Sequence, residues 1–264
     1  YQPKIDMQTR EVIGSEALLR WRKPNEGLIS PIDFIPVLED MGLMVQVGEW
    51  VIFETCRAVK IWIDQGYEPG KVAINLSERQ FGNNALLACF EQALKETGVP
   101  ANKIEVEITE STLHENVGAV RSIITSLKNQ GIQISLDDFG TGYSSLAQLR
   151  TLPFDRLKID RSFVAELHRD GNGSELVEAI VSLGKGLSLP VTAEGVESEE
   201  VRNTLQSLGH LKGQGYLYGR PEDGRATLER LKSLNKLAPH QPAKPAPDTA
   251  VQPADDMAAK RKAS

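Results

Sequence analysis

A pair of adjacent acids at the end of an apolar run is the first feature of this sequence with the means to do chemistry. Asp137 and Asp138 follow residues 132–136, which alternate as a strand does, and they lead into the turn 140–142. Neighbouring side chains on a strand point to opposite faces, so both carboxylates can serve one site only where the backbone bends. We assign that bend to the two glycines of the turn. The doublet predicts a metal site, and a solvated acidic turn is the alternative.

Further polar groups stand at the ends of other predicted strands. The predicted strand ends carry five carboxylates, including Asp137 and Asp138, and one lysine. Carboxylates brought within a few ångströms of one another raise each other's pKa, and one lysine cannot neutralise five carboxylates. Divalent cations can, and oxygen ligands favour Mg²⁺ or Mn²⁺, whereas zinc prefers histidine and cysteine. Together with Asp137 and Asp138 the set comprises Glu16, Asn75, Glu107, Lys158, Glu194 and Gln214.

Two cations about 3.5–4 Å apart form the usual device for in-line displacement at a phosphodiester. Asp137 is the simplest bridge between them. Lys158 would orient or deprotonate the attacking water, or neutralise charge on the phosphoryl group. A salt bridge to Asp160 or to the acids is the alternative for this lysine. Arg20 lies four residues after Glu16 on the predicted strand 12–21 and therefore on the same face, and it is predicted to hold a substrate phosphate.

The strands that must position these groups alternate with helical segments. Repeated strand–helix units imply parallel strands, while the short turn at 7–11 makes the first two strands antiparallel. Seven parallel strands and one antiparallel opening strand predict an α/β fold, a (β/α)8 barrel variant of TIM type. An open, doubly wound sheet is the alternative. The expected strands are 1–6, 12–21, 72–76, 104–108, 132–136, 156–160, 191–194 and 213–216.

The expected helices are placed by periodicity and by capping residues. On the second of them we place Val47, Val51, Ala58 and Ile61 on one face. The helices are expected near 31–41, 44–65, 87–97, 117–130, 176–187, 198–208 and 228–234.

Composition narrows the class of protein. The 264 residues are 40% hydrophobic and 25% charged with net charge −6, as in a water-soluble protein without a general attraction to DNA or RNA. Cys56 and Cys89 fit reduced, buried residues, and no apolar run approaches a membrane span, so we expect a cytoplasmic domain. We assign residues 1–236 to the barrel and the Pro/Ala-rich segment 237–264 to a disordered tail. Because the chain begins at Tyr1 without methionine, we expect it to be part of a longer protein that can itself be membrane-anchored.

Eight motifs in order give the chain a resemblance to the EAL family of cyclic di-GMP phosphodiesterases over about residues 1–230. In sequence letters the longer ones are EALLRW from Glu16, DDFGTGYSSL from Asp137 and LPFDRLKIDRSF from Leu152. The shorter ones are YQP, NLS, EITE, AEGVE and QGYLY, beginning at Tyr1, Asn75, Glu107, Ala193 and Gln214. Family members usually start with a helix and strand before the YQP segment, so the resemblance implies a barrel trimmed at its N-terminus.

The resemblance also implies a role for each matching residue. Glu16, Asn75, Glu107 and Asp137 would hold one Mg²⁺ or Mn²⁺, and Asp137 and Asp138 a second, with Glu194 contributing. Lys158 would assist the nucleophilic water and Gln214 would position it, while Gln2 and Arg20 would touch the substrate. Glu110 and Glu197 would anchor the loop that begins Phe139, Gly140, Thr141, Gly142 and runs to Ser145. In the family this loop couples metal binding to a dimer interface.

The implied reaction is hydrolysis of cyclic di-GMP to linear pGpG. The implied partners are a second copy of the chain and sensor or GGDEF domains before Tyr1. Two alternatives stand beside it: a degenerate domain that binds cyclic di-GMP without cleaving it, and a two-metal phosphodiesterase for another nucleotide.

Overall fold

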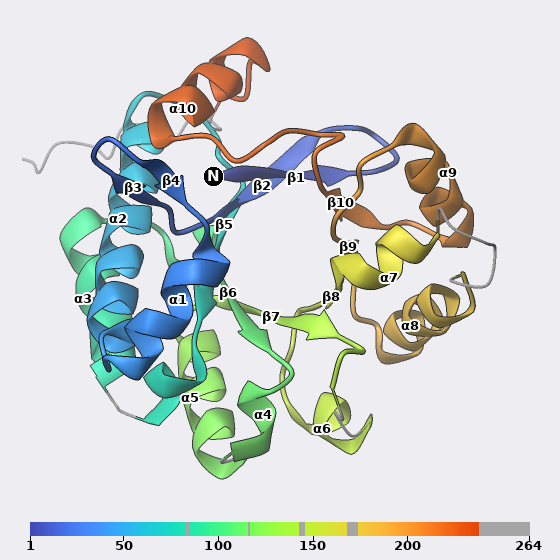
Figure 1. The fold of residues 1–264 in the computed structure, drawn as a ribbon, viewed down its shortest axis with the longest axis horizontal. Helices are drawn as coiled ribbons and strands as arrows, with labels where there is room; N and C mark the ends of the chain where they lie inside the picture. The colour runs from blue at the N-terminus through green and yellow to red at the C-terminus, as the bar shows by residue number, and fades with distance from the viewer. Residues whose placement is uncertain (83–84, 116, 143–145, 168–173, 238–264) are drawn as a thin grey trace, which may run out of the picture.

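The computed structural model describes residues 1–82, 85–115, 117–142, 146–167 and 174–237. A ring of strands occupies the middle of the molecule and helices surround it (Figure 1). The predicted tail lies outside the described residues, apart from Leu237, which is exposed. Within the described ranges no helix is both long enough and apolar enough to cross a membrane.

Eight strands close into a barrel in the order β1-β10-β9-β8-β7-β6-β5-β2. β1 pairs antiparallel with both of its neighbours, and the other neighbouring strands of the ring are parallel. The predicted barrel variant with one antiparallel opening strand is therefore confirmed. The barrel strands are β1 Gln2–Asp6, β2 Val12–Ala17, β5 Lys71–Leu76, β6 Ile104–Thr109, β7 Gln133–Phe139, β8 Arg156–Ile159, β9 Val191–Ala193 and β10 Lys212–Gln214.

The longer helices surround the barrel and pack their apolar faces against its outside. On α2 the buried face includes Ile52, Cys56, Val59 and Trp62, whereas Ile61 is 53% exposed, so the predicted face of this helix is wrong by one position. The α-helices are α1 Pro31–Asp40, α2 Met44–Asp64, α3 Ala85–Thr97, α4 Thr112–Glu115, α5 Val117–Asn129, α6 Leu146–Thr151, α7 Arg161–Glu166, α8 Ser174–Leu187, α9 Glu199–Leu208 and α10 Gly224–Ser233, with 3₁₀ turns at η1 Glu78–Gly82 and η2 Ala101–Lys103.

The predicted strand 12–21 is too long. β2 ends at Ala17, and a separate two-stranded sheet follows, formed by β3 Trp21–Lys23 and β4 Gly27–Ile29. These strands have three residues each and pair only with each other, so they leave little periodicity in the sequence. Trp21 contacts the ring of Phe34 on α1 edge-on, which ties the small sheet to the first helix.

The interior of the barrel is charged, unlike the layers of Val, Ile and Leu that usually fill such barrels. On β6 the aliphatic residues Ile104, Val106 and Ile108 alternate with Glu105 and Glu107, and all five are buried. Since side chains alternate along a strand, the aliphatic set faces the helices and the acids face the interior. Inward carboxylates need charged or hydrogen-bonding partners, and these lie on neighbouring strands.

Candidate active site

The predicted site residues lie at the C-terminal ends of the strands, and the structure brings the polar set together. Glu16, Asn75, Glu107, Asp137 and Lys158 stand on β2, β5, β6, β7 and β8. Asp138 follows on β7, Gln214 ends β10, and Glu194 comes directly after β9. Parallel strands in a closed ring carry these ends to one mouth of the barrel, where TIM-type enzymes place their sites.

Both carboxylate oxygens of Glu16 accept hydrogen bonds from side-chain amides. Asn75 Nδ2 donates to Oε1 over 2.6 Å, and Gln214 Nε2 donates to Oε2 over 2.5 Å. Gln214 also donates to Gln2 Oε1 over 3.1 Å, while Gln2 Nε2 donates to the carbonyl of Gly219. These bonds fix the orientation of Glu16 and join β1, β2, β5 and β10 at the mouth.

Lys158 lies at the centre of the acids and is fully buried. Its Nζ is 2.7 Å from Glu107 Oε2, 2.9 Å from Asp137 Oδ2 and 2.5 Å from Glu194 Oε1. Burial by itself lowers the pKa of Lys158, but the carboxylates of Asp137, Glu107, Glu16 and Glu194 outweigh it and hold the pKa well above its ordinary value. Lys158 therefore forms ion pairs with the acids of the site and not the alternative salt bridge to Asp160.

Asp137, Asp138 and Glu194 form a compact group of oxygen ligands. One carboxylate oxygen from each lies within 4.8 Å of the others. Burial, reinforced by the charges of Asp137 and Asp160, raises the pKa of Asp138 to about 6. Burial also raises the pKa of Glu194 well above its ordinary value, with Asp137 and Glu16 adding to the effect against Lys158. A hard divalent cation at these oxygens would hold the carboxylates ionised, so the donor set fits Mg²⁺ or Mn²⁺.

The bend that lets both aspartates face the site lies at Asp138 itself. Its φ is +52°, a left-handed conformation that is uncommon outside glycine and that aspartate tolerates. The pairing of β7 with β8 also shifts register between Leu136 and Phe139. Assigning the bend to the glycines alone was therefore wrong, although Gly140 does follow with φ +99°.

Glu110 anchors the loop after β7, as the resemblance implies. Its Oε2 accepts hydrogen bonds from the backbone N–H groups of Gly140 and Gly142, each 3.1 Å long. A Cβ added at Gly142 would come within 3.1 Å of the Glu110 carboxyl carbon, so the loop backbone packs closely against this side chain.

The rest of the loop is less closely tied to the site. Thr141 Oγ1 donates to the carbonyl of Asp138, and the Phe139 ring is buried. Glu197 is exposed, and within the described ranges no hydrogen bond or ion pair joins it to the loop. Residues 143–145 lie outside the described residues.

The prediction that Arg20 lies on the same strand face as Glu16 is wrong. β2 ends at Ala17, so Arg20 lies outside the strand that carries Glu16. Its side chain is exposed and donates to the neighbouring carbonyl of Leu19. Burial, followed by the charge of Arg20, lowers the pKa of the Tyr1 amine. A substrate contact for Arg20 stays a prediction.

Sequence reasoning missed three charged residues inside the barrel. Lys4 Nζ lies 2.5 Å from Glu107 Oε1 and 3.6 Å from Glu105 Oε1. Arg156 Nε lies 3.3 Å from the same Glu105 oxygen, and these two cations outweigh burial and lower the pKa of Glu105 to about 2. The two-residue period identifies them, because Lys4, Glu105 and Arg156 stand two positions from the predicted site residues Gln2, Glu107 and Lys158.

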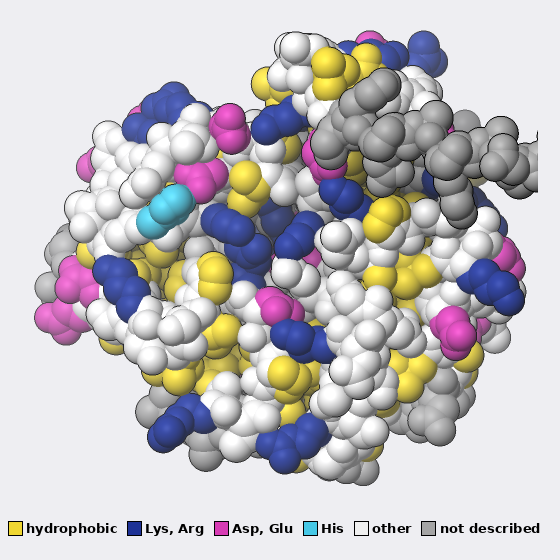
Figure 2. Space-filling view, turned by 180° about the vertical axis from the view of Figure 1, so that it is seen from behind, with side chains coloured by type: hydrophobic (Ala, Val, Ile, Leu, Met, Phe, Trp, Pro, Cys, Tyr) yellow, Lys and Arg dark blue, Asp and Glu magenta, His cyan; other side chains and the backbone are white. Residues whose placement is uncertain are grey.

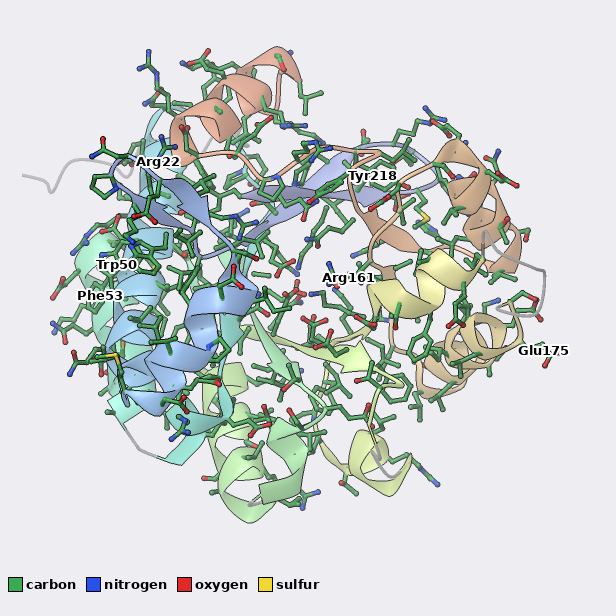
Figure 3. The ribbon with its side chains drawn as sticks, in the orientation of Figure 1. Arg22, Trp50, Phe53, Arg161, Glu175 and Tyr218 are labelled. Atoms are coloured by element: carbon green, nitrogen blue, oxygen red, sulfur yellow. The ribbon has the colours of Figure 1, made fainter. Side chains whose placement is uncertain are left out.

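Arg161 is a further cation at the mouth. It opens α7 directly after β8, and Figure 3 shows it near the middle of the view. A Cβ added at Gly195, next to Glu194, would meet Arg161 Cβ at 2.7 Å. The base of this exposed side chain therefore lies beside the residue that follows Glu194.

Comparison with known proteins gives consistent results. A family model described as EAL domain matches residues 1–221. The chain is 45% identical over 221 residues to the bifunctional diguanylate cyclase/cyclic di-GMP phosphodiesterase MucR of Pseudomonas aeruginosa, covering 84% of this chain and 32% of that one. It spans about a third of the length of the curated relative, so it corresponds to one part of that protein.

Solved structures that share the fold include two with cyclic di-GMP in their descriptions. One is described as PaMucR phosphodiesterase in complex with c-di-GMP, with TM-score 0.82, 44% identity, and coverage of 86% of this chain and 92% of that one. The other is a manganese/cy-diGMP complex of Klebsiella pneumoniae BlrP1, with TM-score 0.72 and 25% identity, covering 83% of this chain and 54% of that one.

Proposed function

The chain belongs to the EAL domain family, and we propose that it hydrolyses one phosphodiester bond of cyclic di-GMP to linear pGpG. The observation that carries this proposal is the completeness of the polar set at the barrel mouth. Each of the eight predicted groups there is present and turned toward the others, from Glu16 on β2 to Gln214 on β10. The relatives described as acting on or binding cyclic di-GMP supply the substrate.

Two divalent cations, Mg²⁺ or Mn²⁺, would complete this site. Glu16, Asn75, Glu107 and Asp137 would hold one, and Asp137 with Asp138 the other, assisted by Glu194. When bound, such ions stabilise the negative charge that develops on a phosphoryl group during in-line displacement. Support comes from the all-oxygen donor set, from the three carboxylates within 4.8 Å, and from the manganese in the BlrP1 complex.

The protein's own groups would fix the geometry around the scissile bond. Lys158 lies among three carboxylates and balances their charge. Once cations engage these carboxylates, its ammonium group would donate a hydrogen bond to an attacking water or a phosphoryl oxygen. Gln214 holds Glu16 in orientation through its amide. Gln2, which is hydrogen-bonded to Gln214, and the cations Arg20 and Arg161 are our candidates for contact with the substrate phosphates.

Partners and regulation also remain proposals. We assign residues 1–236 to the EAL barrel and expect a homodimer in which the Glu110-anchored loop responds to the neighbouring copy. Because the match covers only 32% of a relative described as bifunctional, a covalently linked GGDEF or sensor domain is proposed for the parent protein.

Incubation with cyclic di-GMP and Mg²⁺, followed by chromatography of the products, tests the function. Accumulation of pGpG with cyclic di-AMP left intact supports the proposal. Intact cyclic di-GMP with retained binding would instead show a receptor domain. Equal hydrolysis of both cyclic dinucleotides would show a general two-metal phosphodiesterase.

A further inference from the structure

The end of the barrel opposite the acidic mouth holds a second polar feature of opposite charge. Seen from behind, Lys and Arg side chains gather around a hollow in the middle of the molecule (Figure 2). A cavity of about 310 Å³ opens there, and its lining includes five cations and one carboxylate. The cations are Lys4, Lys71, Lys103, Arg156 and Lys212, and the acid is Glu105.

The order of the strands explains why the cations meet. Lys71, Arg156 and Lys212 are the first residues of β5, β8 and β10, and Lys103 directly precedes β6. These strands are parallel, so their starting residues converge at the end of the barrel away from Asp137 and Asp138. The N-terminal ends of the parallel strands therefore carry cations, whereas their C-terminal ends carry the carboxylates of the acidic mouth.

Protein carboxylates leave part of this positive charge unbalanced. Lys103 pairs with Glu68 at 2.6 Å, and Glu105 is shared between Arg156 and Lys4. Within the described part of the chain, Lys71 and Lys212 have no ion pair or side-chain hydrogen bond, although both are half-buried. Two half-buried, unpaired ammonium groups are unusual in a chain of net charge −6, because desolvated charges are normally paired.

The titration of these lysines supports the same conclusion. Burial, followed by repulsion from Arg156, lowers the pKa of Lys212 to about 8. Burial also lowers the pKa of Lys71, against the attraction of Glu105. An anion in the cavity would relieve both effects.

One wall of the cavity is bare of side chains. A Cβ added at Gly14 would lie 2.2 Å from the carbonyl oxygen of Lys71, and one at Gly70 would lie 2.1 Å from that of Ile13. Gly70 also has φ +71°, so glycine is required at both positions. The backbones of β2 and the segment before β5 thus approach closely, and no side chain projects from these two positions.

We propose that this cavity binds a small polyanion bearing phosphate groups, at a site separate from the acidic mouth. Its volume is at the lower end of the range for small-molecule sites, which suits a phosphate ester or diphosphate. Two ammonium groups without a partner among the described residues, beside the guanidinium that Arg156 shares with Glu105 and Thr192, suit a multiply charged oxyanion.

Titration with pyrophosphate in EDTA and low salt tests the proposal by calorimetry. EDTA removes divalent cations, and the acidic mouth then repels anions, so the heat reports the basic cavity. Wild type is expected to bind one pyrophosphate. Lys71→Gln and Lys212→Gln should each weaken binding about 10-fold or more, the effect of losing one charged hydrogen bond. Lys60→Gln, which removes the same charge from the exposed Lys60–Asp64 pair on α2, should bind like wild type.

Absence of binding, or equal weakening in all three variants, would overturn the site. Citrate binding as tightly as pyrophosphate would overturn the phosphate assignment. Among the described residues neither Lys71 nor Lys212 has an ion-pair partner, so the glutamine variants orphan no carboxylate there and should melt like wild type. A wild-type crystal soaked in pyrophosphate needs no variant: density between β5, β8 and β10 is expected, and an empty cavity would contradict the proposal. Neither experiment depends on hydrolysis of cyclic di-GMP.

Discussion

Replacing Lys158 by methionine should destabilise the cation-free barrel because it removes the ammonium around which three carboxylates are arranged. Glu107, Asp137 and Glu194 lie 2.7, 2.9 and 2.5 Å from Lys158 Nζ. Removing one partner of a buried ion pair costs about 3–5 kcal/mol. A domain of this size loses roughly 2–4 °C of Tm per kcal/mol, giving a fall of about 6–20 °C. Lys4, 2.5 Å from the other oxygen of Glu107, offsets part of the loss, so we expect about 10 °C.

Thermal unfolding followed by circular dichroism in EDTA measures this effect. The matched control is Lys128→Met, which breaks an equally short pair, 2.7 Å to Asp155, whose side chains are 30% and 25% exposed. Such a pair contributes about 1 kcal/mol or less, a few degrees at most. Added Mg²⁺ should recover part of the loss in Lys158→Met and none in the control. Equal Tm values for the two variants in EDTA would refute the idea that Lys158 balances ionised acids.

Three further predictions concern the mouth of the barrel. Asp137→Asn should lower kcat for cyclic di-GMP by more than about 100-fold while leaving the far-UV spectrum unchanged, and the surface variant Asp64→Asn should keep wild-type kcat. Glu110→Ala removes the acceptor for the N–H groups of Gly140 and Gly142. The Mn²⁺ concentration that gives half-maximal activity should therefore rise about 10-fold. The control Glu91→Ala, at an exposed position, should leave this concentration unchanged. In EDTA the Tm should fall as the pH rises from about 4 to about 6. The pKa of Asp138 is raised from 3.8 to about 6 in the folded state, so in this range the folded protein holds a proton that the unfolded chain releases. Saturating Mg²⁺ should flatten the dependence of Tm on pH, and an unchanged dependence would contradict the assignment of Asp138 as a metal ligand.

The sequence predicts the barrel because its strands have a strong pattern. The alternation of Glu105 and Glu107 with Ile104, Val106 and Ile108 identifies both the strand and its two faces. The antiparallel orientation of the first strand follows from the short turn before Val12, because a parallel pair would need a much longer crossover connection.

Other features depend on contacts that the sequence does not encode locally. The β3–β4 hairpin is too short to show periodicity, and its presence separates Arg20 from the strand of Glu16. The left-handed conformation of Asp138 coincides with the register shift between β7 and β8, which depends on the pairing of two distant strands. Lys4 and Arg156 are recognisable as interior residues only once Glu105 and Glu107 are known to face inward and to need cations.

The site residues were predicted as a set because polar groups at strand ends must converge when the strands close into a ring. Their pairing was not predictable in this way. Asn75 and Gln214 both donate to Glu16, and Lys158 lies among Glu107, Asp137 and Glu194, because of distances across the barrel that depend on its closure.

The central claim is that the carboxylates at the barrel mouth hold two divalent cations. Anomalous scattering from crystals grown with Mn²⁺ measures this directly. We expect two peaks about 3.5–4 Å apart, one toward Glu16, Asn75 and Glu107 and one toward Asp138 and Glu194, with Asp137 contacting both. A single peak, or manganese bound only outside this mouth, would contradict the account.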